Sequence, residues 1–147
     1  MNSTFLHRIY SLPLACLSIS ASSDCGESPP MPFIDLHSLT PIEPVPGCRM
    51  RTPFGQHLML SYLEMDDGAE VPLHHHPHEQ GGILLKGKVQ LTIGDETRIV
   101  EAGSLFIIPP NVPHRAVAVD GPATVLDVFS PVREDYAAQM NAYIPPV

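Results

Sequence analysis

The sequence is poor in basic residues. It contains eight Lys and Arg residues against sixteen Asp and Glu residues, so the 147-residue chain has a formal net charge of −8 at pH 7. The basic residues are scattered, and the protein would therefore repel a phosphate backbone rather than bind it. We expect no nucleic-acid partner.

Cysteine is also scarce. The chain has three, Cys16, Cys25 and Cys48, at irregular spacing and without a Cys-x-x-Cys pair. An odd number without such a pair predicts neither a disulfide framework nor a cysteine metal site. The default interpretation is reduced thiols in the cytoplasm.

Long apolar segments are missing. No apolar run approaches the ~20 residues that a membrane-spanning helix needs, so we expect no membrane partner. Residues 1–30 contain a shorter run, Leu12–Ile19, which follows a single Arg8 and resembles a weak secretory signal, although Pro13 interrupts it. The alternative is a flexible extension, or sequence upstream of a true start at Met31. We expect a cytoplasmic protein, or a secreted or periplasmic one if residues 1–30 act as a signal.

Proline and glycine are abundant, with 17 and 10 residues, which disfavours long helices and suits short strands joined by tight turns. From Gln56 onward there are eight short apolar or alternating runs: QHLMLSYLEM, EVPLHHH, GGILLKG, KVQLTIG, TRIVEAG, SLFIIPP, HRAVAVD and ATVLDVFS. The combinations DDG, PHEQ, GDE and DGP lie between them and favour turns. This pattern predicts an all-β protein, a single jelly-roll barrel, in which LTIGDETRIV forms a hairpin.

The predicted organisation has four parts. Residues 1–30 form the extension or signal, residues 31–55 an N-terminal arm with the first strand or strands, residues 56–130 the barrel, and residues 131–147 a short C-terminal helix and tail.

The C-terminal helix is predicted from SPVREDYAAQMNAY, the only segment with a helical pattern. Ser130 can cap it and Pro131 suits its first position. Glu134 and Asp135 would then lie near the positive end of the helix dipole.

The densest group of potential metal ligands lies in VPLHHHPHEQGG, residues 71–82. Successive side chains of a strand point to opposite faces, so His74 and His76 would share one face and His75 would point away. Two imidazoles on one face can bind the same ion, but a metal site needs further ligands.

The remaining ligands are expected from two other places. Glu79 or Gln80 follows the turn after the histidines, and the proline-rich turn in SLFIIPPNVPHRA brings His114 from a distant strand. Four ligands from three strands would form a compact site with open positions for water or substrate.

Two motifs resemble those of the cupin superfamily. The first, G-x5-H-x-H-x3-E-x6-G, is matched by Gly68, His74, His76, Gln80 and Gly87, with Gln in place of Glu. The second, G-x5-P-x-G-x2-H-x3-N, is matched by Gly103, Pro109 and His114, with Asn111 in place of the second Gly and Ala118 in place of the final Asn. The resemblance extends from Gln56 to Ser130. It implies a cupin barrel that holds one divalent metal ion through His74, His76, Gln80 and His114.

The other histidines lack this support. We expect His75 and His78 to be exposed or to lie beside the site, and His7, His37 and His57 to be unrelated surface residues. Arg115 follows His114 on the opposite strand face and is expected to be structural.

Gln80 affects the expected chemistry of the metal. Three neutral imidazoles and a neutral amide would leave the full +2 charge of the ion uncancelled, which favours Lewis-acid catalysis over oxygen activation. Glu79 as the ligand stays an alternative. These ligands suit nickel, zinc, manganese or iron, and the sequence does not choose among them.

A carboxylate lies in the last apolar strand. In ATVLDVFSPVRED, Asp127 shares a face with Val125 and Phe129. A buried carboxylate is unfavourable unless it is paired, hydrogen-bonded or used. Asp127 is therefore a structural partner of Arg133, a residue at an edge open to water, or a general acid/base.

A narrower resemblance concerns the same segment. D-x-F-S-P-x-R-x-D after a barrel that contains HPHEQ resembles the KdgF-type cupins, which open the ring of 4,5-unsaturated monouronates released from pectin or alginate. The resemblance implies that Asp127 moves a proton, Phe129 forms an apolar wall and Arg133 neutralises a substrate carboxylate. The chain departs from this group at Gly82, where the group has a glutamine.

The favoured interpretation is a metal-dependent cupin enzyme that acts on a small, carboxylate-bearing sugar acid, with the linearisation of unsaturated monouronates as the finer hypothesis. The alternatives are a Fe(II)-dependent cupin oxygenase and a non-catalytic cupin that binds a metal or small molecule. By resemblance we also expect a homodimer.

Overall fold

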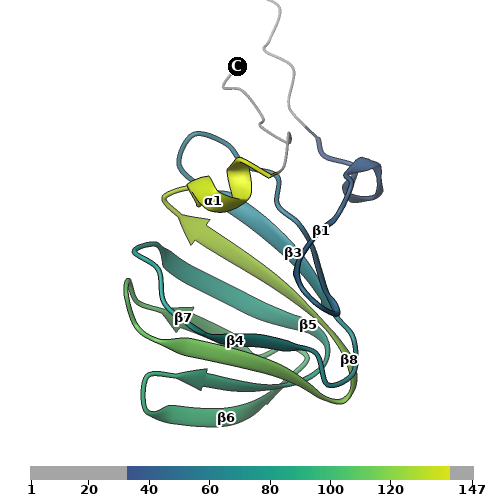
Figure 1. The fold of residues 1–147 in the computed structure, drawn as a ribbon, viewed down its shortest axis with the longest axis vertical. Coiled ribbons are helices and arrows are strands. Elements are labelled where there is room, and N and C mark those ends of the chain that lie inside the picture. The colour runs from purple at the N-terminus through teal and green to yellow at the C-terminus, as the bar shows by residue number, and fades with distance from the viewer. Residues whose placement is uncertain (1–32, 140–147) are drawn as a thin grey trace, which may run out of the picture.

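The computed structural model describes residues 33–139, and antiparallel strands make up most of this part of the chain (Figure 1). The elements are η1 (Leu36–Ser38), β1 (Ile42–Val45), β2 (Cys48–Arg51), β3 (Met59–Met65), β4 (Glu70–His74), β5 (Glu79–Ile93), β6 (Glu96–Glu101), β7 (Leu105–Ile108), β8 (His114–Ser130) and α1 (Glu134–Ala137). The predicted all-β class with one short α-helix is confirmed.

The two long strands, β5 and β8, connect the two layers of the barrel. The first part of β5 pairs with β7 and with the second part of β8, while the second part of β5 pairs with β6 and with the first part of β8. β3, β2 and β1 continue the first layer beyond β8, and β4 pairs with β8 in the second. Figure 1 shows β5 and β8 running through the body of the molecule. This is the sandwich-like barrel that the spacing of the runs predicts.

The eight predicted runs differ from the strands in one respect. GGILLKG and KVQLTIG are one continuous strand, β5, and HRAVAVD and ATVLDVFS are another, β8. The glycines between them bend these strands instead of ending them: Gly87 has φ 79° and Gly121 has φ 121°, and the β5–β8 register shifts there. The predicted hairpin is confirmed, with Ile93 opposite Glu96.

The helix begins later than predicted. β8 continues through Ser130, which pairs with Glu79, so Ser130 is part of the sheet and does not cap the helix. The Ser130–Pro131 peptide bond is cis, and α1 starts at Glu134, after Arg133 as its N-cap. The predicted capping by Ser130 and first position for Pro131 are therefore wrong. Residues 140–143 of the predicted helix lie outside the described residues.

Alternating side chains of the strands fill the barrel. In β3 every second residue is buried, as the two-residue period of a strand requires. The buried apolar cluster is Cys48, Met50, Leu63, Met65, Leu84, Val89, Leu91, Ala118, Ala123 and Val125. Cys48 is a free thiol within this core, and Cys16 and Cys25 lie outside the described residues. Between residues 33 and 139, no helix has the length and apolar character needed to cross a membrane.

Candidate metal centre and substrate pocket

Three histidines meet inside the barrel. His74 ends β4 and His114 begins β8, and the antiparallel β4–β8 register pairs them directly, with ring centroids 4.1 Å apart. His76 lies two residues beyond the end of β4 and joins them from the loop. One ring nitrogen from each histidine lies within 4.8 Å of the others. The three therefore lie within metal-binding distance of one another.

Backbone carbonyls fix the orientation of all three rings. The Nδ1 atom of His74 lies 2.8 Å from the carbonyl oxygen of Pro72. The Nδ1 atom of His76 lies 3.1 Å from the carbonyl oxygen of His78, and that of His114 lies 2.9 Å from the carbonyl oxygen of Val112. A carbonyl oxygen only accepts, so each Nδ1 donates, and a neutral ring then has its lone pair on Nε2. The Nε2 atom of His114 is buried without a hydrogen-bond partner. A histidine held at Nδ1 with a free Nε2 is the usual state of a metal ligand.

The electrostatic environment keeps these rings neutral. Burial lowers the pKa of His74 and of His114, and burial with the positive charge of Arg133 lowers the pKa of His76 to about 4. At neutral pH the three rings are therefore neutral, each with one N–H and one lone pair. Their lone pairs are available for a cation.

Gln80 is the fourth polar group at this point. Its Oε1 lies 3.2 Å from Nε2 of His76, while Nδ1 of the same ring faces the carbonyl of His78. A neutral imidazole carries one N–H and cannot donate to both oxygens, so one contact joins two acceptors unless a cation lies between them. Glu79 is exposed on the opposite face of β5, and the structure therefore brings Gln80 to the histidines. This set of donors fits a divalent metal ion.

In the described part of the chain, the side chains of the remaining histidines lie outside the candidate metal centre. His75 is exposed, which agrees with the first of the two positions expected for it, exposed or beside the site. His78 is not exposed: it is buried beside His76, and its Nε2 lies 3.4 Å from a carboxylate oxygen of Glu134. His37 and His57 are exposed, and His7 lies outside the described residues. Arg115 forms an ion pair with Glu70, with Nε 2.6 Å from Oε1, which agrees with a structural role.

Asp127 is a buried carboxyl next to this group. It is 5% exposed, and its Oδ1 accepts a hydrogen bond of 2.9 Å from Nε2 of Gln80. Burial raises its pKa to about 7, although the hydrogen bond from Gln80 and the charge of Arg133 act in the opposite direction. The expectation of an edge position open to water is therefore wrong. A carboxyl of this kind can exchange a proton near neutral pH.

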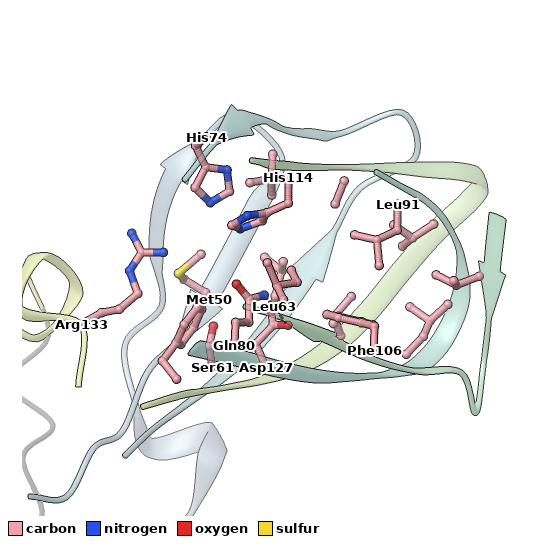
Figure 2. A pocket seen from close by; sticks show the side chains of 18 of the residues that line it. Met50, Ser61, Leu63, His74, Gln80, Leu91, Phe106, His114, Asp127 and Arg133 are labelled. Atoms are coloured by element: carbon pink, nitrogen blue, oxygen red, sulfur yellow. Dashed lines mark hydrogen bonds between the residues drawn. The ribbon is translucent and has the colours of Figure 1, made fainter. Parts of the chain in front are cut away.

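Arg133 does not form an ion pair with Asp127, which was one of the three expectations for that carboxylate. Its Nε and Nη2 instead donate to the carboxylate of Asp135, at 3.1 and 2.6 Å, and its guanidinium lies 3.9 Å from the ring centroid of Tyr136. The pair with Asp127 is absent because α1 begins immediately after Arg133 and offers a nearer acid. Figure 2 shows the guanidinium on the α1 side of the pocket, with His74 and Met50 nearby.

Phe129 contacts both His76 and Arg133. It is 3% exposed, and its ring lies edge-on to His76 at 5.5 Å and 5.2 Å from the Arg133 guanidinium. The residues predicted for catalysis and the four predicted ligands therefore line or adjoin one pocket. Figure 2 shows the apolar side of that pocket at Leu91 and Phe106, and its polar side at Gln80 and the histidines.

Phe106 is a pocket residue that the sequence reasoning missed. A Cβ atom on Gly82 would lie 2.2 Å from Cζ of Phe106 and 2.7 Å from Oδ1 of Asp127. The Phe106 ring from β7 thus fills the space next to Gly82, which explains why glycine is needed here. The signal was the alternation in β7, where Leu105 and Ile107 are exposed and Phe106 between them points inward.

We expect Gly82→Ala to destabilise the protein by about 1–3 kcal/mol, because the added methyl group overpacks the space held by Phe106. Gly81→Ala is the matched control, since its Cβ would meet no atom within 4 Å. Urea unfolding of the two variants measures the difference. Equal free energies of unfolding would contradict the packing argument.

Comparison with known protein families agrees with this geometry. A family model described as "Cupin domain" (Cupin_2) matches residues 61–129, from β3 to the end of β8. The chain contains a cupin domain.

Known proteins similar to this chain include an isomerase and KdgF. The chain is 40% identical over 60 residues to the H2HPP isomerase of Bacillus subtilis, a match that covers 40% of this chain and only 25% of the isomerase. It is 29% identical over 80 residues to the pectin degradation protein KdgF of Dickeya dadantii (strain 3937), which covers 54% of this chain and 73% of KdgF. The solved structure of KdgF from Halomonas sp. superposes with a TM-score of 0.68 and 28% identity, over 73% of this chain and 99% of that one. The resemblance to KdgF-type cupins is confirmed.

Proposed function

We propose that this cupin is a metal-dependent enzyme that linearises 4,5-unsaturated monouronates, small sugar acids of the kind released in pectin or alginate breakdown. The observation that carries the proposal is the buried Asp127 carboxyl, hydrogen-bonded to Gln80 beside three neutral histidines. Similarity to KdgF in sequence and in structure supports it.

His74, His76, His114 and Gln80 would hold the metal. When bound, a divalent ion supplies a Lewis acid that polarises a substrate oxygen. Nickel, zinc, manganese and iron stay possible in this prediction, because imidazole and amide ligands suit all four.

Asp127 would move the proton. Ring opening would remove the proton of the anomeric hydroxyl and break the bond between the anomeric carbon and the ring oxygen, which leaves an aldehyde and an enolate. The enolate becomes a ketone when that proton is returned to carbon. Substrate and product are isomers, so no oxidant or second reactant is consumed, and one buried carboxyl can take up and return the proton.

Arg133 and Phe129 would bind the substrate. Asp135 accepts hydrogen bonds from Nε and Nη2 of Arg133, and the guanidinium lies over the ring of Tyr136. Nη1 would then contact a substrate carboxylate. Phe129 would form the apolar wall beside His76.

The test follows the ultraviolet absorbance of an unsaturated monouronate in the presence of protein loaded with each of the four metals. We expect absorbance loss without oxygen uptake, and none after chelation of the metal. Oxygen uptake with iron alone would instead indicate an oxygenase. Tight binding of the uronate without turnover would indicate a binding protein. The homodimer and the cytoplasmic location stay predictions, which light scattering and cell fractionation can check.

A further inference from the structure

The hydrogen bond between Gln80 and Asp127 determines which atom of the amide faces the histidines. A glutamine amide can be rotated by half a turn, which exchanges its oxygen and its nitrogen at almost no change in shape. The oxygen can bind a cation, whereas the NH₂ group would direct two positive hydrogens at it. The orientation of this amide therefore decides whether Gln80 can be a ligand.

Asp127 selects one orientation. The ionised form of Asp127 only accepts, so its Oδ1 takes the 2.9 Å hydrogen bond from Nε2 of Gln80, and Oε1 of Gln80 then lies 3.2 Å from Nε2 of His76. Within residues 33–139, the hydrogen bonds of the Gln80 side chain go to these two groups. Both side chains are buried, at 7% and 5% exposure, so water does not readily replace Asp127 as the acceptor.

We propose that Asp127 is a positioning residue for the metal centre, which holds the amide oxygen of Gln80 toward the metal, in addition to its proposed part in proton transfer. The inference rests on the proposed metal site. It also accounts for the departure from the cupin motif at position 80. A glutamate there would place a second carboxylate within hydrogen-bond distance of Asp127 in a buried place, where two like charges repel strongly.

The decisive comparison introduces Asp127→Ala into two proteins, one with the native Gln80 and one with Gln80→Glu. A carboxylate at position 80 has two equivalent oxygens and needs no orientation, whereas an amide does. We therefore expect Asp127→Ala to weaken Zn²⁺ binding about 10- to 100-fold in the native background, the usual effect of losing a group that supports a metal ligand. In a Gln80→Glu background, Asp127→Ala should leave Zn²⁺ affinity unchanged or raise it. Competition with a chromophoric chelator measures all four proteins.

Asp127→Asn separates the hydrogen bond from the charge. Its amide oxygen can still accept from Gln80, so we expect Zn²⁺ affinity within about threefold of wild type, as for a weakened but retained hydrogen bond. Thermal unfolding of the metal-free variants checks that each is folded, and Asp127→Asn also serves if Asp127→Ala does not fold.

Three results would overturn the inference. Asp127→Ala could bind Zn²⁺ as tightly as wild type, or could lose affinity equally in both backgrounds, which would indicate a purely electrostatic effect of the Asp127 charge. Asp127→Asn could lose as much affinity as Asp127→Ala. Because these experiments measure Zn²⁺ affinity alone, a wild-type protein that binds Zn²⁺ but does not open the uronate ring would overturn the proposed function and not this inference.

Discussion

Replacing His114 with alanine is expected to abolish metal binding and activity while the barrel stays folded. His114 supplies the ligand from β8, and its buried Nε2 has no hydrogen-bond partner, so the side chain has no stabilising contact at that atom to lose. Loss of a group that only supports a ligand weakens a metal site about 10- to 100-fold, and loss of a ligand itself should exceed about 100-fold. Metal analysis of the purified variant and the uronate assay measure both effects.

His75→Ala is the matched control for this experiment. His75 lies in the same run of histidines as His74 and His76 but is exposed, so its loss should change neither metal content nor activity. The melting temperature of the metal-free His114→Ala protein should stay close to that of metal-free wild type. Normal metal content in His114→Ala, or an equal loss in His75→Ala, would contradict the assigned centre.

The candidate metal centre could be anticipated because its proposed ligands follow from local rules. Side-chain alternation predicted that His75 points away from His74 and His76, which agrees with its exposure, although β4 ends at His74 and His76 reaches the site from the loop. The spacing to Gly87 distinguishes Gln80 from Glu79, which the structure places on opposite faces of β5. The β4–β8 pairing that unites His74 and His114 is long-range, but the two motifs place both residues at strand ends. The fold and the candidate metal centre could thus be predicted from motif spacing combined with strand geometry.

The features that escaped prediction depend on packing between distant segments. Phe106 fills the space next to Gly82 only because β7 pairs with β5. The local sequence pattern predicts that Phe106 points inward, but it does not predict that the ring contacts Gly82. His78 is buried because it lies against α1 and the His76 ring. The glycines in β5 and β8 look like turn signals, yet extensive pairing on both sides keeps these strands continuous.

The ion pair between Arg133 and Asp135 also depends on how the chain folds after β8. From the sequence, Asp127 and Asp135 are both acids near this arginine, and only the path of the chain after β8 decides between them. Because Asp135 takes the guanidinium, Asp127 keeps no partner of opposite charge in direct contact, and its pKa is raised by burial instead of lowered. The pairing that was not predicted therefore leaves Asp127 in the state that proton transfer needs.

Asp127→Asn should lower kcat by about 10²- to 10⁴-fold, the usual contribution of a general acid/base, with near-normal metal content. Asparagine has the same shape and still accepts the hydrogen bond from Gln80, but it cannot take up and return a proton. KM should change little, because Arg133 keeps its contacts with Asp135 and Tyr136. Steady-state kinetics on the metal-loaded variant give both constants.

Asp95→Asn is the control for the loss of one negative charge, since Asp95 is exposed in the turn between β5 and β6. It should retain wild-type kcat. The comparison also separates the two parts proposed for Asp127: Asp127→Ala should lose metal and activity together, whereas Asp127→Asn should lose activity alone. If Asp127→Asn turns over the uronate at the wild-type rate with normal metal content, the proton moves through another group, and the buried carboxyl serves only to orient Gln80.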